Sequence, residues 1–272
     1  MSLTLVVGAG GFVGSCYADH VERDGHRVVR AGRRRGLDVV LSTSDRLDAV
    51  LAEHEPDQIV VTAQLADPAT GWLLERIDGP RWLVLSSAQL ASSVPGPGHR
   101  QALIHERLAR SRGAVVLRPT MIFGRGRDLN ITRLLRQIAR LGFATQFGGS
   151  QLVQPLHIDD LSVLMEQHLA NPSTQVAGDL FDVGGREQLP VAELLDCLEQ
   201  LAGAAGPRLV LPAAALVVIA RAASLGGLRS DQVARLIEDK VVDITKVCEL
   251  FGWQPEFLPL RLEQAYSEAE IK

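Results

Sequence analysis

The feature that most constrains the fold is a short apolar run near the start of the sequence, followed at once by a glycine-rich turn. Leu3 to Val7 is almost wholly apolar, which is typical of a strand buried on both faces of a parallel sheet. Stretches of helical length, such as Asp45 to His54, separate further runs of this kind, which lie at 27–31, 58–63, 82–86, 114–118 and 180–183. This alternation predicts βαβ units with right-handed crossovers, and therefore an α/β fold with a doubly wound parallel sheet.

The turn after the first run reads Gly8-Ala9-Gly10-Gly11-Phe12-Val13-Gly14, and a helix-compatible stretch follows it. A side chain at such a turn would block a pyrophosphate, which the backbone N–H groups of the helix start must face. Because the glycines lie between a predicted strand and a predicted helix, they favour a dinucleotide site over a plain glycine-rich turn. We therefore predict that the cofactor contacts Gly8, Gly10, Gly11, Phe12, Val13 and Gly14.

The end of the second predicted strand indicates which dinucleotide is bound. An acidic residue about 20 positions after the glycines would bind the ribose 2′-hydroxyl of NAD, but nothing acidic lies between Asp24 and Asp38. The strand instead runs into Gly32, Arg33, Arg34 and Arg35, whose guanidinium groups suit a 2′-phosphate. We predict NADP in preference to NAD, with contacts from Gly32, Arg33 and Arg34; the alternative is that these arginines are simply solvated.

The pattern changes after Gly124. Residues 131–141 read as a helix, and from 189 onward the chain looks purely helical. The apolar stretch 212–224 is too short for a membrane span, so we expect a buried helix there, with a peripheral membrane contact as the alternative. We assign 1–124 plus 152–184 to a dinucleotide-binding domain of Rossmann type, and 125–151 plus 185–272 to a smaller, mostly helical substrate or partner domain.

Composition argues against several classes of protein. The net charge of −4 provides no basic field for nucleic acid. The three cysteines, Cys16, Cys197 and Cys248, lie far apart and fit neither a disulfide framework nor a zinc site. The first residues show no charged leader or cleavage site. We expect a cytoplasmic protein with reduced thiols, no transmembrane segment and no nucleic-acid partner, either a monomer or a homodimer.

Several segments together resemble the extended or atypical short-chain dehydrogenase/reductases, the NAD(P)-dependent epimerase/dehydratase superfamily. Besides the glycine turn, they are Pro56 to Ala63, Leu83 to Ser87, and Leu117 to Gly124, which is similar to the family's RPxxxxG segment. Gln154 to Leu161 and Phe181 to Gly185 resemble the family's later elements. The resemblance implies further cofactor contacts from Thr62, Ala63, Ser86, Pro119, Thr120 and Met121.

One departure from the family concerns its catalytic pair, a Tyr with a Lys four residues later and a Glu a further four along. If Glu106 takes the place of that Glu, the Tyr falls at Gly98 and the Lys at Ala102. No shift of alignment supplies them, because residues 18–239 contain neither Tyr nor Lys. A proton donor of this kind contributes on the order of 10² to 10⁴ in rate.

Other side chains are candidates for the missing chemistry. The resemblance places Ser87 at the catalytic hydroxyl, binding a substrate carbonyl, although a serine there also caps a turn. His99 lies one position from the Tyr place and is our candidate proton donor, with a plain surface histidine as the alternative. His105 lies on the same stretch.

The substrate contacts that we predict come from Ser87, Arg133, Arg136 and His157. Arg133, Arg136 and Arg140 share one helix stripe, which would suit a nucleotide diphosphate or form a solvated face. His157, Asp159 and Asp160 have metal-ligand side chains, but we expect them to begin a helix, and we predict no metal site.

The resemblance implies an oxidoreductase or epimerase acting on a nucleotide sugar or a similar keto/hydroxy compound, with a non-standard proton donor. The rival hypothesis, favoured by the missing pair, is a non-catalytic NADP(H)-binding redox sensor or accessory subunit.

Overall fold

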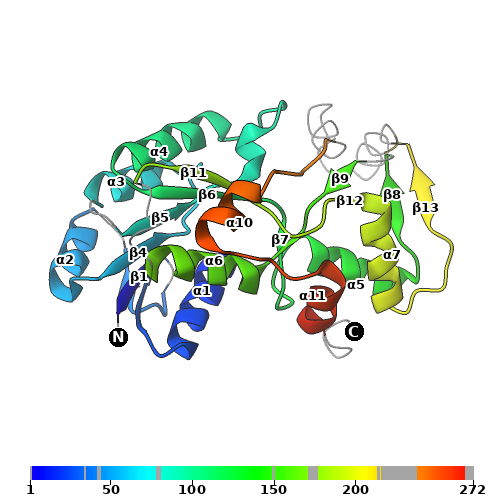
Figure 1. The fold of residues 1–272 in the computed structure, drawn as a ribbon, viewed down its shortest axis with the longest axis horizontal. Helices are drawn as coiled ribbons and strands as arrows, with labels where there is room; N and C mark the ends of the chain where they lie inside the picture. Colours follow the sequence, from blue (N-terminus) through cyan, green and yellow to red (C-terminus); the bar gives the residue numbers. More distant parts are fainter. Residues whose placement is uncertain are drawn as a thin grey trace.

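The structure is a computed structural model, and it describes residues 2–33, 35–41, 44–77, 81–148, 151–170, 177–212, 215 and 238–266. Its larger part is a parallel sheet between two layers of helices, and its smaller part carries short strands and helices (Figure 1). No helix of the described residues is long and apolar enough to cross a membrane.

Seven parallel strands form the central sheet, which confirms the predicted Rossmann-type fold. The order reverses between β1 and β4, since the chain first runs outward to β3 and then returns to the other side of β1. Such a switch point is where doubly wound sheets bind ligands, beyond the carboxyl ends of the strands. In spatial order the strands are β3 (Val39–Val40), β2 (Arg27–Gly32), β1 (Leu3–Val7), β4 (Gln58–Val61), β5 (Trp82–Leu85), β6 (Val115–Pro119) and β11 (Leu180–Val183).

The strands are apolar throughout because both faces of the sheet are covered. Successive side chains point to opposite faces. Val6 therefore joins the core beneath one helix layer, while Leu5 and Val7 join the core beneath the other. The first layer contains α1 (Phe12–Arg23), α6 (Ile158–Ala170) and α10 (Thr245–Phe251), and the second contains α2 (Ser44–His54), α3 (Pro68–Arg76) and α4 (His99–Ser111) (Figure 1).

The smaller part has a hydrophobic core of its own, built from three helices. They are α5 (Ile131–Leu141), α7 (Val191–Leu201) and α11 (Leu258–Ala265). Three two-stranded sheets join them, with β7 (Ile122–Phe123) beside β10 (Leu156–His157), β9 (Leu152–Val153) beside β12 (Leu189–Pro190), and β8 (Thr145–Phe147) beside β13 (Leu209–Leu211).

The prediction that the chain is purely helical from 189 onward is wrong, because β12 and β13 are strands. Each is two or three residues long, too short for a periodic pattern, and each exists because an earlier segment pairs with it. The apolar stretch 212–224 lies outside the described residues except for 212 and 215.

The segment around α10 packs onto the larger part, although the sequence analysis assigned it to the smaller domain. Val247 and Trp253 enter the core formed with α6 and β11. The Trp253 indole Nε1 donates to the Asp160 carbonyl at 2.9 Å. The chain therefore returns to the sheet before it ends in α11 (Figure 1).

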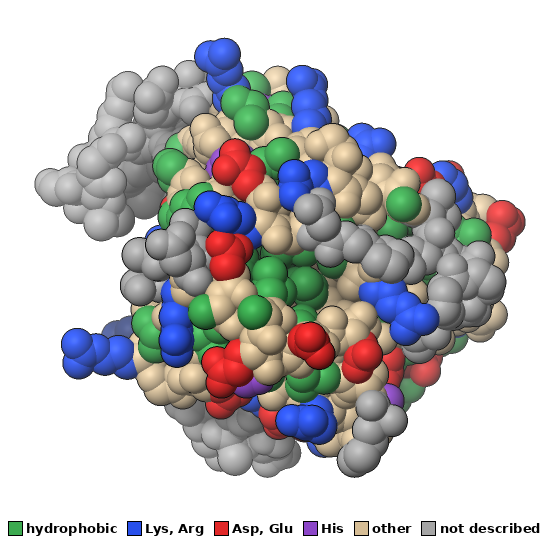
Figure 2. Space-filling view, turned by 90° about the vertical axis from the view of Figure 1, so that its left-hand side faces the viewer, with side chains coloured by type: hydrophobic (Ala, Val, Ile, Leu, Met, Phe, Trp, Pro, Cys, Tyr) green, Lys and Arg blue, Asp and Glu red, His purple; other side chains and the backbone are tan. Residues whose placement is uncertain are grey.

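The surface mixes charges of both signs. On the face shown in Figure 2, basic and acidic side chains are interspersed, with apolar side chains between them. This matches the small net charge of the chain.

Candidate functional site

The glycine turn lies between β1 and α1, and two of its glycines leave no room for a side chain. A Cβ at Gly8 would lie 2.7 Å from the Thr62 hydroxyl, and Gly8 has a φ of +96° that few other residues adopt. A Cβ at Gly14 would lie 2.5 Å from both the Gly8 carbonyl oxygen and the Thr62 hydroxyl. These glycines let α1 approach β1 and β4 closely at the switch point.

The start of α1 is suited to an anion. Gly11 is the N-cap residue, no side chain caps the helix, and its first turn carries no acidic residue. The N–H groups of the first turn, at Phe12, Val13 and Gly14, have no partner inside a helix, and the helix dipole is positive at this end. Gly10 lies within the turn that leads to them. The residues present therefore fit the pyrophosphate of a dinucleotide.

The end of β2 presents a paired arginine. Arg33 follows Gly32, its side chain is 68% exposed, and its Nη2 lies 2.6 Å from the Asp67 carboxylate. Asp67 also caps α3 by accepting from the Ala69 N–H at 3.0 Å. Sequence reasoning missed Asp67 because it follows β4, far along the chain from β2. Arg34 lies outside the described residues.

Ser86 follows β5 and belongs to a buried polar cluster under α4. Its hydroxyl donates to Glu106 at 2.6 Å, and Glu106, only 3% exposed, accepts two hydrogen bonds from Arg118 at 2.8 and 2.6 Å. Asp182 lies opposite Arg118 in the register of β11 and β6, and burial raises the pKa of the Asp182 carboxyl. Glu106 therefore binds two structural partners, Ser86 just after β5 and Arg118 in β6.

At the two positions where the family has Tyr and Lys, this chain has Gly98, which lies at the start of α4, and Ala102, which packs in the core. Gly98 is the N-cap residue, with a φ of +73°, and a Cβ there would meet the Ala66 side chain at 2.7 Å. Ala102 is buried in the sheet-facing core. His99 is the first residue of α4 and is half-buried. His105 is buried and bonds to the Leu65 carbonyl and to Gln101. Its ring packs against Gly71 of α3.

Ser87 has a local role of its own. Its oxygen accepts a hydrogen bond from the Gln89 N–H at 3.2 Å and caps the short 3₁₀ helix Ala88–Ala91. The hydroxyl proton is not used by that bond, so it is left to donate to another oxygen.

The other residues that the family resemblance assigns to the cofactor line the carboxyl ends of β4 and β6. The Thr62 hydroxyl donates to the Val7 carbonyl at 3.2 Å, and the Thr120 hydroxyl donates to the Gln154 carbonyl at 2.5 Å. Ala63 follows Thr62, and its backbone N–H lies beneath Gly8. Pro119 ends β6, and the Met121 carbonyl accepts from the Leu156 N–H. The two threonine hydroxyls therefore link neighbouring segments at the edge of the site, Thr62 to β1 and Thr120 to the segment after β9.

His157 lies behind this rim. It is buried between Phe123 and Gly124, its ring packs edge-on to Phe123 at 5.1 Å, and burial lowers its pKa to about 4. Its Nε2 is buried without a hydrogen bond in the described residues. The neighbouring Asp159 and Asp160 open α6 and pair with Arg125 and Arg261.

The arginine stripe of α5 faces outward. Arg133, Arg136 and Arg140 are exposed, whereas the opposite face of α5 enters the core of the smaller part. Arg136 donates to the Gly126 carbonyl at 3.0 Å. Arg133 and Arg136 stay predicted substrate contacts.

Both tyrosines are buried away from the serines. Tyr17 lies in α1, and burial raises its pKa. Tyr266 donates to Asp128 at 2.9 Å, and burial also raises its pKa. Lys240 is half-buried beside Val153, and Lys246 lies near Asp179. Among the described residues, none of these groups lies on α4, where the family pattern places its catalytic pair.

A family model described as the NAD dependent epimerase/dehydratase family matches residues 4–74, which span the glycine turn, β2 and β4. No sequence among the curated proteins matches the chain. The match to the family model, together with the fold, confirms the resemblance to this superfamily.

Many solved structures share the fold. UDP-glucuronic acid 4-epimerase from Bacillus cereus, in complex with UDP-glucuronic acid and NAD, superposes with a TM-score of 0.76 at 19% identity, over 99% of this chain and 98% of its own. dTDP-glucose 4,6-dehydratase from Bacillus anthracis, in complex with NAD, gives 0.74 at 14% identity over 97% and 95%. UDP-glucose 4-epimerase from Thermotoga maritima, with UDP-glucose, gives 0.72 at 16% identity over 97% of each chain.

Proposed function

We propose that this chain, which resembles the NAD-dependent epimerase/dehydratase superfamily in its amino-terminal segment and in its fold, is an oxidoreductase that binds a nicotinamide dinucleotide. Its substrate would be a nucleotide sugar or a similar keto/hydroxy compound. The observation that carries the proposal is the uncapped start of α1, reached through two glycines that tolerate no side chain. Three structural neighbours were solved with nucleotide sugars or NAD, which supports the same ligand classes here.

NADP is the preferred cofactor in this proposal. The exposed Arg33 guanidinium stands at the end of β2, where a dinucleotide presents its adenosine ribose. A 2′-phosphate would take the place of the Asp67 carboxylate as its partner, in the bidentate geometry that a guanidinium favours. The 2′-hydroxyl of NAD carries no charge to compete with Asp67.

When bound, the cofactor supplies or accepts the hydride. Ser87 would donate a hydrogen bond from its hydroxyl to the substrate oxygen and keep its proton, and the rim at Thr120 would hold the reacting carbon near the cofactor. The proton that the family's Tyr would transfer would come from His99 at the start of α4, from water or from the substrate itself. Arg133 and Arg136 of α5, together with His157 at the end of β10, are the proposed substrate contacts.

A second candidate function is binding without catalysis, as a redox sensor or an accessory subunit. The specific observation in its favour is the start of α4, where Gly98 lies against Ala66 and Ala102 is packed in the core. These contacts leave no place for a Tyr or a Lys. Cofactor binding would then alter association with a partner protein.

Calorimetric titration of the full chain with NADPH, and with NADH as the control, tests the binding step. We expect NADPH to bind at least about tenfold more tightly, a difference of about 1.4 kcal/mol. Equal affinities would remove the preference for NADP, and the absence of heat with both would overturn the binding proposal itself.

Following NADPH absorbance with a panel of keto-sugar nucleotides separates the two candidates. Steady, substrate-dependent oxidation would support the enzyme and exclude the sensor. Ser87→Ala should then lower turnover without changing the NADPH dissociation constant. The matched control is Ser111→Ala, because Ser111 lies at the other end of α4 and its hydroxyl donates only to the Leu108 carbonyl.

A further inference from the structure

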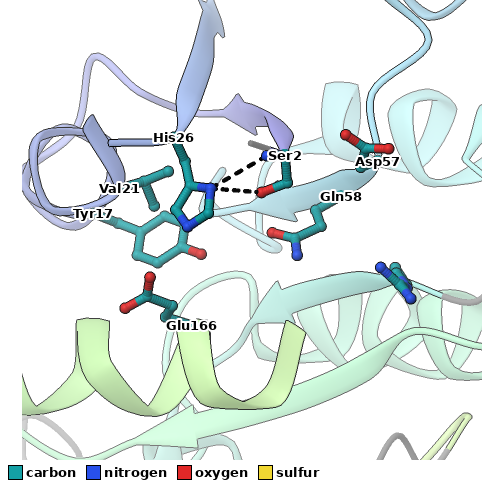
Figure 3. A pocket seen from close by; sticks show the side chains of 8 residues that line it. Ser2, Tyr17, Val21, His26, Asp57, Gln58 and Glu166 are labelled. Atoms are coloured by element: carbon teal, nitrogen blue, oxygen red, sulfur yellow. Dashed lines mark hydrogen bonds between the residues drawn. The ribbon is translucent and has the colours of Figure 1, made fainter. Parts of the chain in front are cut away.

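The amino edge of the sheet, opposite the glycine turn, has a pocket of about 360 Å³. It opens between residues that precede or begin four strands and residues of α1 and α6. Figure 3 shows its side chains: His26 hydrogen-bonded to Ser2, the Tyr17 ring beside Val21, and Glu166 pointing up from α6. No step of the proposed function uses this edge.

Beside this pocket, three metal-ligating side chains converge. His20 and Asp24 lie one turn apart at the end of α1, and Glu166 lies on α6, which packs against α1. The His20 Nε2 is 3.0 Å from one Glu166 oxygen and 3.5 Å from one Asp24 oxygen. One donor atom from each of the three residues lies within 4.8 Å of the other two.

The donor atoms are close enough together to surround one ion after a small adjustment: the 3.5 Å separation is that of a coordination sphere, and the 3.0 Å hydrogen bond would lengthen by a few tenths of an ångström. Around a tetrahedral ion with bonds of about 2.0–2.2 Å to nitrogen and oxygen, neighbouring donors are about 3.3–3.5 Å apart. One imidazole and two carboxylates form a ligand set that suits zinc and other divalent first-row metals. The site lies at the carboxyl end of α1, where the helix dipole favours a cation.

The pocket supplies a second, independent observation. Tyr17 is only 1% exposed, yet its hydroxyl faces the pocket and makes no hydrogen bond within the described residues (Figure 3). Its ring lies 6.5 Å from the His20 ring, and the Glu166 charge acts on it. A side chain buried to this degree, whose hydroxyl opens onto a pocket and has no protein partner, indicates that the pocket accepts a ligand with a polar atom.

We propose that His20, Asp24 and Glu166 bind one divalent transition-metal ion, whose open coordination position faces the pocket beside Tyr17. A water or an oxygen-bearing ligand at that position would give the Tyr17 hydroxyl its partner. Three protein ligands with one open position are the arrangement of zinc sites that bind a further molecule. The rival is a cluster without a metal, in which His20 hydrogen-bonds to Glu166 and lies beside Asp24.

Metal titration of the chelator-stripped full chain decides between them. We expect one Zn²⁺ per chain in competition with a chromophoric chelator, and a Co²⁺ spectrum without a thiolate charge-transfer band. Glu166→Gln and Asp24→Asn should each weaken binding by at least about tenfold. Both side chains are partly exposed, so both variants should fold, and circular dichroism checks this.

Glu22→Gln is the matched control, because it removes an exposed carboxylate from the same helix outside the cluster. Its Zn²⁺ affinity should equal that of the wild type. The proposal is overturned if the wild type binds no stoichiometric Zn²⁺, if the Co²⁺ spectrum shows thiolate ligands, or if all three variants bind equally. Since NADPH is absent from the titration, failure here leaves the proposed function untouched.

Discussion

The two halves of the carboxyl edge differ in what their polar groups are engaged in. In the cofactor half, formed by the residues after β1, β2 and β4, the start of α1 has no capping side chain and Arg33 is exposed. In the α4 half, formed by the residues after β5 and β6 together with α4, Ser86 and Arg118 are both bonded to the buried Glu106. The polar groups of the cofactor half are therefore available to an anion, whereas those of the α4 half are mainly hydrogen-bonded to one another.

This difference teaches that the binding of a dinucleotide and the chemistry performed on it depend on separate residues in this fold. A chain can keep the close approach of α1 to β1 while α4 loses its Tyr and Lys, because no contact of the glycine turn depends on them. The four predictions that follow test whether the two halves are as separate as the contacts indicate.

The largest effect is expected from Glu106→Gln in the α4 half. The change leaves Arg118, whose side chain is 15% exposed, without its charge partner, which should cost about 3–5 kcal/mol of unfolding free energy. Urea unfolding measures this loss, and the exposed Glu249→Gln should stay within about 0.5 kcal/mol of the wild type. If the two halves are independent, the folded variant binds NADPH as tightly as the wild type does. A large loss of NADPH affinity would show that cofactor binding depends on the Glu106 cluster.

Gly14→Ala tests the cofactor half by adding a side chain inside the glycine turn. The added Cβ would lie 2.5 Å from the Gly8 carbonyl oxygen, so α1 must shift, at a cost of up to about 3 kcal/mol and with the loss of NADPH binding. Thermal unfolding and calorimetry measure the two effects. Gly25→Ala is the control: its φ of +83° also disfavours alanine, but nothing lies within 4 Å, so cofactor binding should survive. Retained binding in Gly14→Ala would show that the turn does not form the site.

His157 makes the region behind the α4 half sensitive to acid. Its folded-state pKa of about 4 lies below the ordinary 6.5, so the unfolded chain binds the proton more tightly. The contribution of His157 is therefore complete above pH 6.5 and is lost as the pH falls towards 4. It should amount to about 2 kcal/mol between pH 7 and pH 5.

Urea unfolding at these two pH values measures the effect, and His157→Leu should reduce the difference by that amount. His168, in the last turn of α6, is the matched comparison, because burial also lowers its pKa to about 4. An unchanged pH difference in His157→Leu would show that His157 is not buried in its neutral form.

Arg33→Ala gives the smallest effect and sharpens the definition of the cofactor half. NADPH affinity should fall about tenfold, or about 1.4 kcal/mol, while NADH affinity changes little. Asp67→Asn is the complementary variant, because it frees the guanidinium and should raise NADPH affinity. Equal losses for both cofactors in Arg33→Ala would mean that Arg33 does not contact a 2′-phosphate.

Much of the sheet and of the glycine turn was predictable because those signals are local. Each buried strand is a continuous apolar run, and each of the six runs identified in the sequence overlaps a strand of the sheet. The short strands β12 and β13 were missed, because the segments that pair with them lie elsewhere in the chain. The packing of α10 on the larger part also has no local signal, because the core that it enters comes from other segments. The same reason hid Asp67, which has no sequence signal that connects it to Arg33.

By itself, the sequence determined the parallel α/β architecture and the strand, turn and helix that begin it, because apolar runs and glycines act on their immediate neighbours. Only the tertiary structure decided that Ser86 donates to Glu106, that Arg33 faces Asp67, and that His20 and Glu166 meet across two helices. Those pairs join residues from different elements. Their distances follow from how the layers pack on the sheet, which no local pattern encodes.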